Sequence, residues 1–228
     1  MSVAAILACA GSGVRMGGNS DKLLLDLQGR PVMAWAISAL ERSEVVDSIT
    51  VAASENNIEA IAELLQRLDC ALPVELVLGG RRRQDSVAMA LEHLAESAPD
   101  MVIVHDGARP LVSPGLVRTV LESATEHGAA IVGLPLKNAT KEVDDRGFIR
   151  RSLERNTLVS VQTPQAFRFE LLLRAHREGA AQGAVVDDDA ELVERIGSPV
   201  KVVRGDYRNI KITTPDDIAV AEVHLATT

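Results

Sequence analysis

The sequence is poor in aromatic residues and cysteine, and it has no long apolar segment. One tryptophan, one tyrosine and three phenylalanines are present among 228 residues, so few rings are available to stack on single-stranded nucleic acid. No apolar run approaches the roughly 18 residues needed to cross a bilayer. The two cysteines, Cys9 and Cys70, have neither metal-ligand spacing nor a disulfide framework. We therefore expect a cytoplasmic globular protein without a membrane partner, whose core is built from Ala, Val, Leu and Ile.

The charge is acidic overall but has a local basic pattern. A formal net charge of −8 argues against nucleic acid as the main partner, because the phosphate backbone favours basic surfaces. Many cations nevertheless fall in or beside predicted loops. They are Arg15, Lys22, Arg81, Arg82, Arg83, Arg109, Lys137, Lys141, Arg150, Arg151, Arg155 and Lys211. An acidic protein with basic loops is suited to a small polyanionic substrate.

Apolar, β-rich runs alternate with helical patterns along the whole chain. The predicted strands are residues 3–9, 48–53, 74–78, 101–105, 129–134, 200–203 and 210–213. The predicted helices are residues 31–43, 56–68, 84–95, 114–126, 169–178, 188–196 and 215–225. Near-continuous apolar strands that alternate with helices predict an α/β fold with a doubly wound, mostly parallel sheet, in a single domain over residues 1–228. Ligands of such sheets bind beyond the carboxyl ends of the strands.

Two short runs, residues 136–143 and 148–153, interrupt this alternation. The segment between them, Asp-Asp-Arg-Gly at 144–147, contains a turn glycine and predicts a β-hairpin. The hairpin is rich in Lys and Arg and has too few apolar residues to join the sheet, and an isolated hairpin is marginal in water. We expect this arm, at about 136–155, to pack against a second subunit and mediate dimerisation. A flexible solvated arm is the alternative.

The glycine-rich segment after the first predicted strand indicates a phosphate site. Residues 10–18 read Ala-Gly-Ser-Gly-Val-Arg-Met-Gly-Gly, and a strand that opens into such a turn presents backbone N–H groups to phosphate oxygens. The dinucleotide fingerprint fails because Met16 stands at its third glycine, and the P-loop pattern fails because Asn19 stands where lysine is required. Arg15 and Lys22 add positive charge, so the loop predicts a bound nucleoside triphosphate. A tight turn without a ligand is the alternative.

Two later segments add candidates at the same edge of the sheet. Gly79–Gly80 can approach a ligand closely and Ser86 can face it from the next helix, while the three arginines between them form either part of this site or a solvated patch. Asp106 stands at the tip of a buried strand, before a small-residue turn and Arg109. One or two carboxylates together with substrate phosphates hold Mg²⁺ in phosphoryl-type transfer. Asp106 is therefore a candidate metal ligand, with helix capping or turn formation as its alternative role. His105, which precedes it, is expected to pack or hydrogen-bond within the strand.

The last third of the chain has three further features. Residues 161–167 form a turn-rich stretch that no core requires. Lys211 lies in a predicted strand, where burial of an ammonium is costly without an anion. The acidic cluster Asp187–Asp189 is either a metal site or a helix N-terminus rich in acid, and we favour the helix N-terminus.

These motifs resemble those of the 2-C-methyl-D-erythritol 4-phosphate cytidylyltransferase family. The matching segments are residues 7–16 with Lys22, Gly-Gly…Arg…Ser-Val at 79–87, His-Asp-Gly-Ala-Arg-Pro at 105–110, Gln-Thr-Pro-Gln at 162–165 and Asn-Ile-Lys-Ile-Thr at 209–213. They occur in the family's order and spacing over essentially the whole chain. The resemblance implies a Rossmann-like nucleotidyltransferase fold with a β-arm. It also implies transfer of CMP from CTP to the phosphate of methylerythritol phosphate in the non-mevalonate isoprenoid pathway, with Mg²⁺ as cofactor and pyrophosphate as the second product.

The resemblance further implies a role for each candidate residue. The catalytic cations would be Arg15, Lys22 and Lys211. The CTP-binding residues would be Ala10, Gly11, Ser12, Gly13, Gly80, Arg81 and Ser86. The acceptor-binding residues would be Asp106 and Arg109, together with Thr140 and Arg155 from the arm of the other subunit in a homodimer with shared sites. Asp106 would also lie beside the metal.

Two positions depart from the family's usual pattern. Ala8 replaces a proline, which should change little beyond the rigidity of the turn. Asp187 stands where a threonine usually reaches the acceptor phosphate, and a carboxylate there would repel it, so Asp187 is left out of the expected site. Two other functions share these features, namely a ribitol 5-phosphate cytidylyltransferase and a non-catalytic CTP-binding protein of the same fold.

Overall fold

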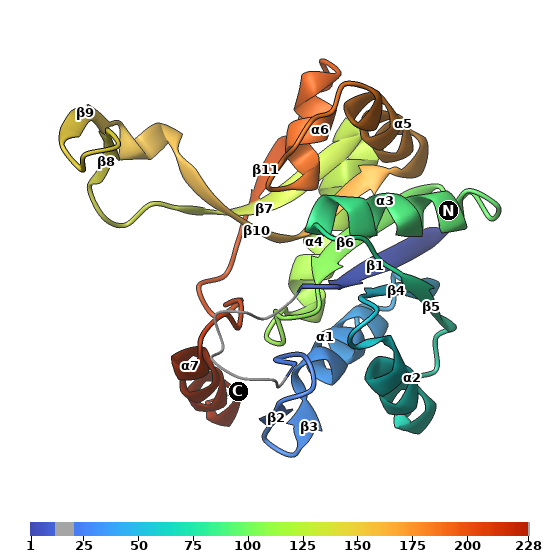
Figure 1. The fold of residues 1–228 in the computed structure, drawn as a ribbon. Coiled ribbons are helices and arrows are strands. Elements are labelled where there is room, and N and C mark those ends of the chain that lie inside the picture. The colour runs from blue at the N-terminus through green and yellow to red at the C-terminus, as the bar shows by residue number, and fades with distance from the viewer. Residues whose placement is uncertain (12–20, 228) are drawn as a thin grey trace.

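A seven-stranded sheet forms the centre of the fold, with the strand order β11-β7-β10-β6-β1-β4-β5 (Figure 1). The structure is a computed structural model and describes residues 1–11 and 21–227. The strands are β1 (Val3–Cys9), β4 (Ser48–Ala53), β5 (Val74–Leu78), β6 (Met101–Asp106), β7 (Ala129–Pro135), β10 (Val159–Arg168) and β11 (Lys201–Arg204). Neighbouring strands are parallel except that β10 runs antiparallel to β6 and β7. The predicted mostly parallel α/β sheet is confirmed.

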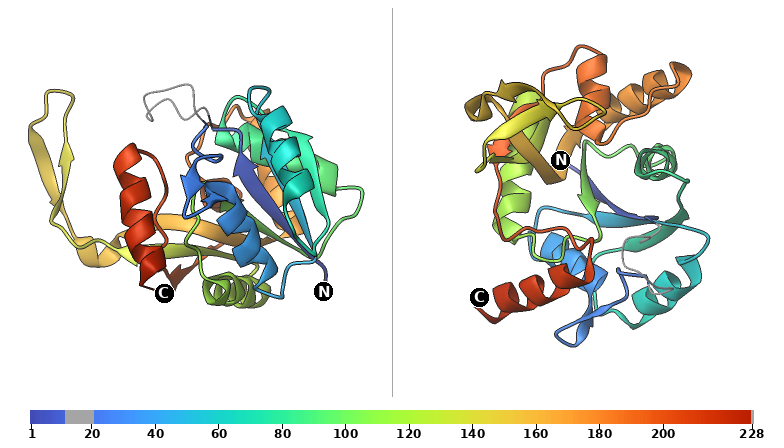
Figure 2. Two further views of the ribbon diagram at one scale, coloured as in Figure 1. Left: turned by 90° about the horizontal axis from the view of Figure 1, so that it is seen from below. Right: turned by 60° about the vertical axis from the view of Figure 1, so that its left-hand side comes forward.

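Helices cover both faces of the sheet, as two further views show (Figure 2). One face packs against α1 (Val32–Glu41), α2 (Ile58–Arg67) and α4 (Pro114–His127), and the other against α3 (Arg83–Leu94), α5 (Phe169–Ala181) and α6 (Asp189–Arg195). Strand β1 contributes Leu7 to the first core and Ile6 to the second. Burial on both faces explains why the central strands read as continuous apolar runs. None of the described helices is both long enough and apolar enough to cross a membrane.

Strand β10 corrects the interpretation of residues 161–167 as a turn-rich stretch that no core requires. Ala166 and Phe167 are fully buried, and both pair with β6 and with β7. Pro164 has no N–H to donate to the ladder, and the pairing with β7 shifts between Gln162 and Gln165. Proline is tolerated at such an irregularity in a sheet. The sequence of this strand resembles a turn because it contains polar residues. The side chains of two of them, Gln162 and Thr163, bond to other segments, as described below.

The prediction of a strand at residues 210–213 is wrong. This segment is extended but is not a strand of the sheet, and Ile212 N–H donates to Ala108 O at 2.8 Å. Its apolar side chains pack elsewhere: Ile212 joins Leu27 and Ala221 in a small third core. This core lies between α7 (Pro215–Ala226) and the short hairpin of β2 (Asp26–Leu27) and β3 (Arg30–Pro31). Helix α7 begins as predicted, with Thr214 N–H donating to the Asp217 carboxylate at 2.8 Å.

The predicted hairpin arm is confirmed as a separate two-stranded sheet. It consists of β8 (Thr140–Val143) and β9 (Ile149–Leu153), and it projects from the ends of β7 and β10 (Figure 1). Asp144 closes the turn, because its Oδ1 accepts two backbone N–H groups within it. The exposed apolar side chains of the arm are Val143, Phe148 and Ile149, at 53%, 69% and 63% relative exposure. Such a group of exposed apolar side chains is typical of a surface that another protein covers.

Candidate active site

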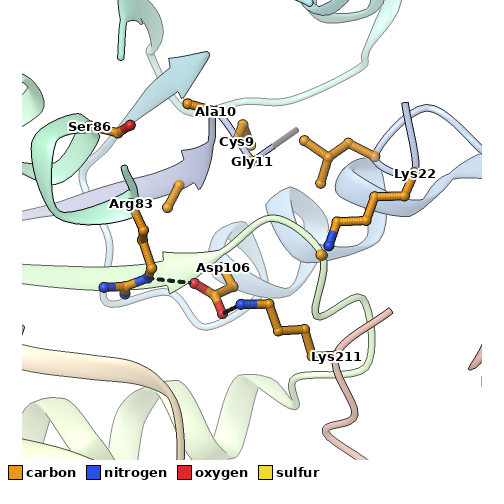
Figure 3. A pocket seen from close by; sticks show the side chains of 11 residues that line it. Cys9, Ala10, Gly11, Lys22, Arg83, Ser86, Asp106 and Lys211 are labelled. Atoms are coloured by element: carbon orange, nitrogen blue, oxygen red, sulfur yellow. Dashed lines mark hydrogen bonds and ion pairs between the residues drawn. The ribbon is translucent and has the colours of Figure 1, made fainter. Parts of the chain in front are cut away.

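Three cavities lie at the carboxyl ends of the central strands and share lining residues. The central cavity, of about 80 Å³, is lined by residues that include Ala10, Gly11, Lys22, Arg83, Ser86, Asp106 and Lys211 (Figure 3). The β5-side cavity, of about 510 Å³, shares Ala10 and adds Gly79, Gly80 and Arg81. The β10-side cavity, of about 240 Å³, shares Arg83, Asp106 and Lys211 and adds Arg109 and Asp187. Ala10 and Lys211 are about 200 positions apart in the sequence. Both line the central cavity, at the edge of the sheet where the parallel strands end.

Asp106 lies at the centre of this edge and contacts three cations. Its Oδ1 accepts a hydrogen bond from Arg83 Nε at 2.9 Å, and its Oδ2 lies 2.7 Å from Lys211 Nζ and 3.7 Å from Arg109 Nε. Figure 3 shows Arg83 and Lys211 reaching the carboxylate from opposite sides. Burial alone would raise the pKa of Asp106, but the charges of Arg83, Lys211 and Arg109 outweigh burial and hold the pKa well below its ordinary value. The carboxylate is therefore ionised, and the cavity has net positive charge.

The sequence left open whether Arg83 belongs to the site or to a solvated patch and did not include it among the expected site residues, whereas the structure places it in the site. The three consecutive arginines separate in the structure: Arg81 and Arg82 are exposed, whereas the Arg83 guanidinium bridges Asp106 and Asp189, with NH1 donating to Asp189 Oδ2 at 2.7 Å. His176 Nε2 lies 3.0 Å from Asp189 Oδ1, and both side chains are buried. The signal available was helical spacing, because Arg83 precedes Ser86 by one turn and so shares its face.

Lys211 is placed by hydrogen bonds to its neighbour Asn209. The Asn209 carbonyl accepts from Arg109 NH1 at 2.8 Å and from Gln162 Nε2 at 3.0 Å. The side-chain Nδ2 of Asn209 donates to the backbone carbonyl of Thr163 at 2.8 Å. These bonds hold the extended segment of Lys211 against β6 and β10, which explains why β10 carries polar residues in a buried position.

His105 is buried and hydrogen-bonded, but its partners lie outside its own strand: Thr163 is on β10, and Arg109 is in the loop after β6. Asp106 N–H donates to Thr163 Oγ1 at 3.0 Å, and Thr163 Oγ1 lies 3.0 Å from His105 Nδ1. His105 Nε2 lies 3.2 Å from Arg109 O, and a carbonyl only accepts, so the proton is on Nε2 and Nδ1 accepts from Thr163. Burial lowers the pKa of His105 to about 4, so the ring is neutral near pH 7.

Gly80 and Ser86 form a rigid corner between β5 and α3. Ser86 Oγ accepts from Gly80 N–H at 3.1 Å and donates to Arg82 O at 2.9 Å. A Cβ atom at Gly80 would collide with Asp85 Cβ, so this close approach requires glycine. The corner holds Gly79 and Gly80 at the lining of the β5-side cavity.

Comparison with known proteins identifies the family. The family model described as 2-C-methyl-D-erythritol 4-phosphate cytidylyltransferase matches residues 3–227. The chain belongs to this family. A protein of that name from Pelotomaculum thermopropionicum is 45% identical over 224 residues, which are 96% of this chain and 92% of the relative. One from Dehalococcoides mccartyi is 40% identical and covers 98% of this chain and 96% of its own length.

Solved structures show the same likeness. The crystal structure of 4-diphosphocytidyl-2C-methyl-D-erythritol synthase from Anaerococcus prevotii superimposes with a TM-score of 0.86 at 29% identity, covering 99% of this chain and 98% of that one. The 2-C-methyl-D-erythritol 4-phosphate cytidylyltransferase from Thermus thermophilus gives a TM-score of 0.80 at 33% identity, with both chains fully covered. The protein is therefore a cytidylyltransferase, and the ribitol phosphate and non-catalytic alternatives are not favoured.

The acidic cluster of this cytidylyltransferase is a helix N-terminus, as we favoured. Asp188 caps α6, because its Oδ1 accepts from Glu191 N–H at 3.1 Å. Asp187 is exposed and lines the β10-side cavity beside Arg109 and Lys211. Within residues 1–11 and 21–227, no group of three or more His, Cys, Asp or Glu side chains is placed to hold a metal ion.

Some predicted site residues of the cytidylyltransferase are not brought to the cavities. Thr140 and Arg155 lie on and beside the projecting arm, where Arg155 NH1 donates to Lys137 O at 2.9 Å. The arm projects away from the central sheet (Figure 1), and none of its residues lines the three cavities. The predicted residues Ser12, Gly13 and Arg15 lie outside the described residues.

Proposed function

We propose that this chain transfers CMP from CTP to the phosphate of 2-C-methyl-D-erythritol 4-phosphate, giving 4-diphosphocytidyl-2-C-methyl-D-erythritol and pyrophosphate. Beyond family membership, the observation that carries this proposal is that the three cavities share lining residues. Arg83, Asp106 and Lys211 line both the central and the β10-side cavity, and Ala10 lines both the central and the β5-side cavity. A donor nucleotide and an acceptor phosphate that bind at opposite ends of such a cleft would meet at its cationic centre. The reaction is a step of the non-mevalonate isoprenoid pathway.

Each cavity is suited to one part of the two substrates. The β5-side cavity, with Gly80, Arg81 and the nearby Ser86, would read cytosine and ribose. The central cavity would hold the triphosphate against Ala10, Gly11 and Lys22. The β10-side cavity would hold the acceptor, with Arg109 and Lys211 facing its phosphate. Asp187, exposed at the rim of this cavity, is excluded from phosphate binding by its charge.

The chemistry requires charge compensation more than proton transfer. An oxygen of the acceptor phosphate forms a bond to the α-phosphorus of CTP, the bond from that phosphorus to the bridging oxygen breaks, and pyrophosphate leaves with the electron pair. A phosphate monoester is largely ionised at neutral pH, so no side chain has to remove a proton. The barrier arises mainly from bringing two polyanions together in line. Lys22, Lys211 and Arg15 would lower it through fixed positive charge.

We propose Mg²⁺ as the cofactor, with Asp106 as its protein ligand. Among the residues that the structure describes, Asp106 is the one carboxylate that lines the central cavity, and Mg²⁺ typically binds one or two carboxylates together with substrate phosphates. Its oxygens also contact Arg83 and Lys211, which would keep the carboxylate ionised for the metal. When bound, Mg²⁺ withdraws charge from the phosphate oxygens.

We propose that the working unit is a homodimer in which each arm completes the other subunit's acceptor site. Thr140 and Arg155 stand away from the cavities of their own chain, and the arm carries exposed apolar side chains that a second subunit would cover. We further propose that the enzyme acts in the cytoplasm, which suits its two free thiols, Cys9 and Cys70.

Mixed dimers test the shared site. Subunits with Lys22→Ala combined with subunits with Arg155→Ala should regenerate one intact site, because Lys22 of one subunit would meet Arg155 of the other. We expect turnover of about half that of the unaltered dimer, since one of two sites is restored. Each parent should be impaired; for Arg155→Ala, KM for the acceptor should rise about 10- to 150-fold, the effect of losing one charge-assisted phosphate contact.

The matched control places both substitutions on one subunit. Dimers of a Lys22→Ala/Arg155→Ala subunit with an unaltered subunit should contain no intact site if the sites are shared, and one intact site if they are not. Restored activity in this control, together with none in the mixed parental dimer, would refute the shared site. A fully active monomer in sedimentation would also refute it.

A further inference from the structure

The side chain of Asn57 connects three segments at the carboxyl edge of the sheet. Its Nδ2 donates to the carbonyl of Cys9, at the end of β1, at 2.9 Å and also to the carboxylate of Asp21. Its Oδ1 accepts from Ser54 N–H at 2.8 Å and from Ser54 Oγ at 2.9 Å. A primary amide offers two N–H donors and two acceptor lone pairs, so its full hydrogen-bonding capacity is used. Asn57 is 5% exposed.

Asn57 does not perform the task usual for its position. It is the N-cap residue of α2, where an asparagine side chain normally accepts a hydrogen bond from a backbone N–H of the first turn. The Asn57 side chain makes no such bond. Its amide points instead to β1, to the segment after β4 and to Asp21. A local preference given up in this way is expected near functional sites.

The residues held by Asn57 adjoin the central cavity. Ala10 and Gly11, which line it, directly follow Cys9, and Lys22, which also lines it, directly follows Asp21. The other oxygen of Asp21, Oδ1, accepts from Leu23 N–H at 2.9 Å. The Asp21 carboxylate is therefore fixed to Asn57 on one side and to the backbone beyond Lys22 on the other. This arrangement sets the position of Lys22 relative to the end of β1.

We propose that Asn57 is a positioning residue for cytidylyl transfer, which holds Lys22 at the central cavity through Asp21 without touching the nucleotide. This inference rests on the proposed role of Lys22 at the triphosphate. It assigns to the residue that precedes α2 an effect on the chemical step, in addition to any effect on folding.

The variant Asn57→Asp isolates this role. Aspartate has the same shape, still accepts from Ser54 and remains a good N-cap residue, but it places a carboxylate against Asp21 and the Cys9 carbonyl. We expect kcat to fall by about 10- to 100-fold, because a displacement of about 1 Å in a catalytic group has effects of this size. The control Gln66→Glu makes the same amide-to-carboxylate change on the exposed surface of α2 and should leave kcat unchanged.

Two double variants separate positioning from a general effect on stability. Adding Asp21→Asn to Asn57→Asp restores a donor–acceptor pair with reversed polarity, and kcat should recover to within about 5-fold of the unaltered enzyme. In a Lys22→Ala background, Asn57→Asp should lower kcat by less than about 2-fold, because its effect acts through Lys22. Thermal unfolding of every variant is measured in parallel.

The inference is overturned if Asn57→Asp lowers kcat equally with and without Lys22. It is also overturned if the variant lowers the melting temperature while kcat per folded enzyme stays unchanged. The unaltered enzyme distinguishes the two proposals: absence of cytidylyl transfer there refutes the proposed function, whereas normal transfer with either of these results refutes only the role of Asn57.

Discussion

The Lys22→Ala variant is expected to turn over CTP and 2-C-methyl-D-erythritol 4-phosphate about 10²–10³-fold more slowly than the unaltered enzyme. Lys22 lines the central cavity together with Lys211 and Asp106, where the α-phosphorus would lie. In the proposed reaction its ammonium would stabilise negative charge as that charge develops on the phosphates. The measurement is the steady-state rate of pyrophosphate release at saturating substrates.

The matched control for this variant is Lys201→Ala, which removes a lysine from the exposed edge of β11. It should leave kcat unchanged. The free energy of unfolding of both variants should lie within about 0.5 kcal/mol of that of the unaltered protein, as is usual for substitutions outside the core. An unchanged kcat in Lys22→Ala, or a variant that fails to fold, would return Lys22 to a purely structural role.

The Asp106→Asn variant is expected to lose both stability and activity. The substitution leaves the charges of Arg83, Lys211 and Arg109 uncompensated around a buried amide. Breaking a buried ion pair on one side costs about 3–5 kcal/mol, which denaturant unfolding at pH 7 would measure. Because Lys211 loses the anion that holds it and the proposed Mg²⁺ would lose its proposed ligand, we expect kcat to fall by at least about 10²-fold.

The pH dependence of unfolding distinguishes Asp106 from other carboxylates. Its pKa in the folded protein lies well below the value of about 3.9 in the unfolded chain. Its contribution to stability is therefore fully present above about pH 4 and is lost as the pH falls further. The stability difference between the unaltered protein and Asp106→Asn should narrow below pH 4. A difference independent of pH would show that the carboxylate charge is not what stabilises the fold.

The surface variant Glu92→Gln is the comparison for Asp106→Asn. Glu92 pairs with Arg177 at 2.7 Å, with both side chains more than half exposed. Exposed ion pairs contribute at most about 1 kcal/mol, so this variant should be nearly neutral. The contrast would show that burial among three cations, and not ion pairing as such, gives Asp106 its effect.

The sequence predicts the parts of the site that follow directly from apolar strands. Gly11 follows β1 and Asp106 ends β6, and the carboxyl ends of parallel strands lie at the ligand edge of an α/β sheet. Residues at these ends can therefore be assigned from local pattern alone. The same reasoning places Gly80 after the end of β5, at the same edge of the sheet.

The remaining parts of the site depend on contacts between distant residues. Arg83 bonds to Asp106 and Asp189, which are 23 and 106 positions away, and no local pattern reports such partners. Strand β10 is hidden for the same reason, since Gln162 Nε2 donates to the Asn209 carbonyl and Thr163 Oγ1 lies within hydrogen-bond distance of His105 Nδ1. Tertiary bonds let polar residues occupy a buried strand that intrinsic preference alone disfavours.

Residues 210–213 show the opposite error. Their apolar alternation is typical of a strand, but Ile212 packs against α7 and the β2–β3 hairpin in the third core. An extended segment that buries alternate side chains has the same pattern whether or not its backbone joins a ladder. The pattern therefore predicted correctly that Ile212 is buried, and wrongly that the backbone of residues 210–213 pairs with the sheet.

Pyrophosphate release from CTP in the presence and absence of 2-C-methyl-D-erythritol 4-phosphate tests the proposed function most directly. Parallel reactions contain ATP, GTP or UTP as the donor, or ribitol 5-phosphate as the acceptor, each with Mg²⁺. We expect rapid release with CTP and methylerythritol phosphate together, and little release in every other combination. Equal rates with ATP or UTP, a preference for ribitol 5-phosphate, or no release with any pair would contradict the assignment.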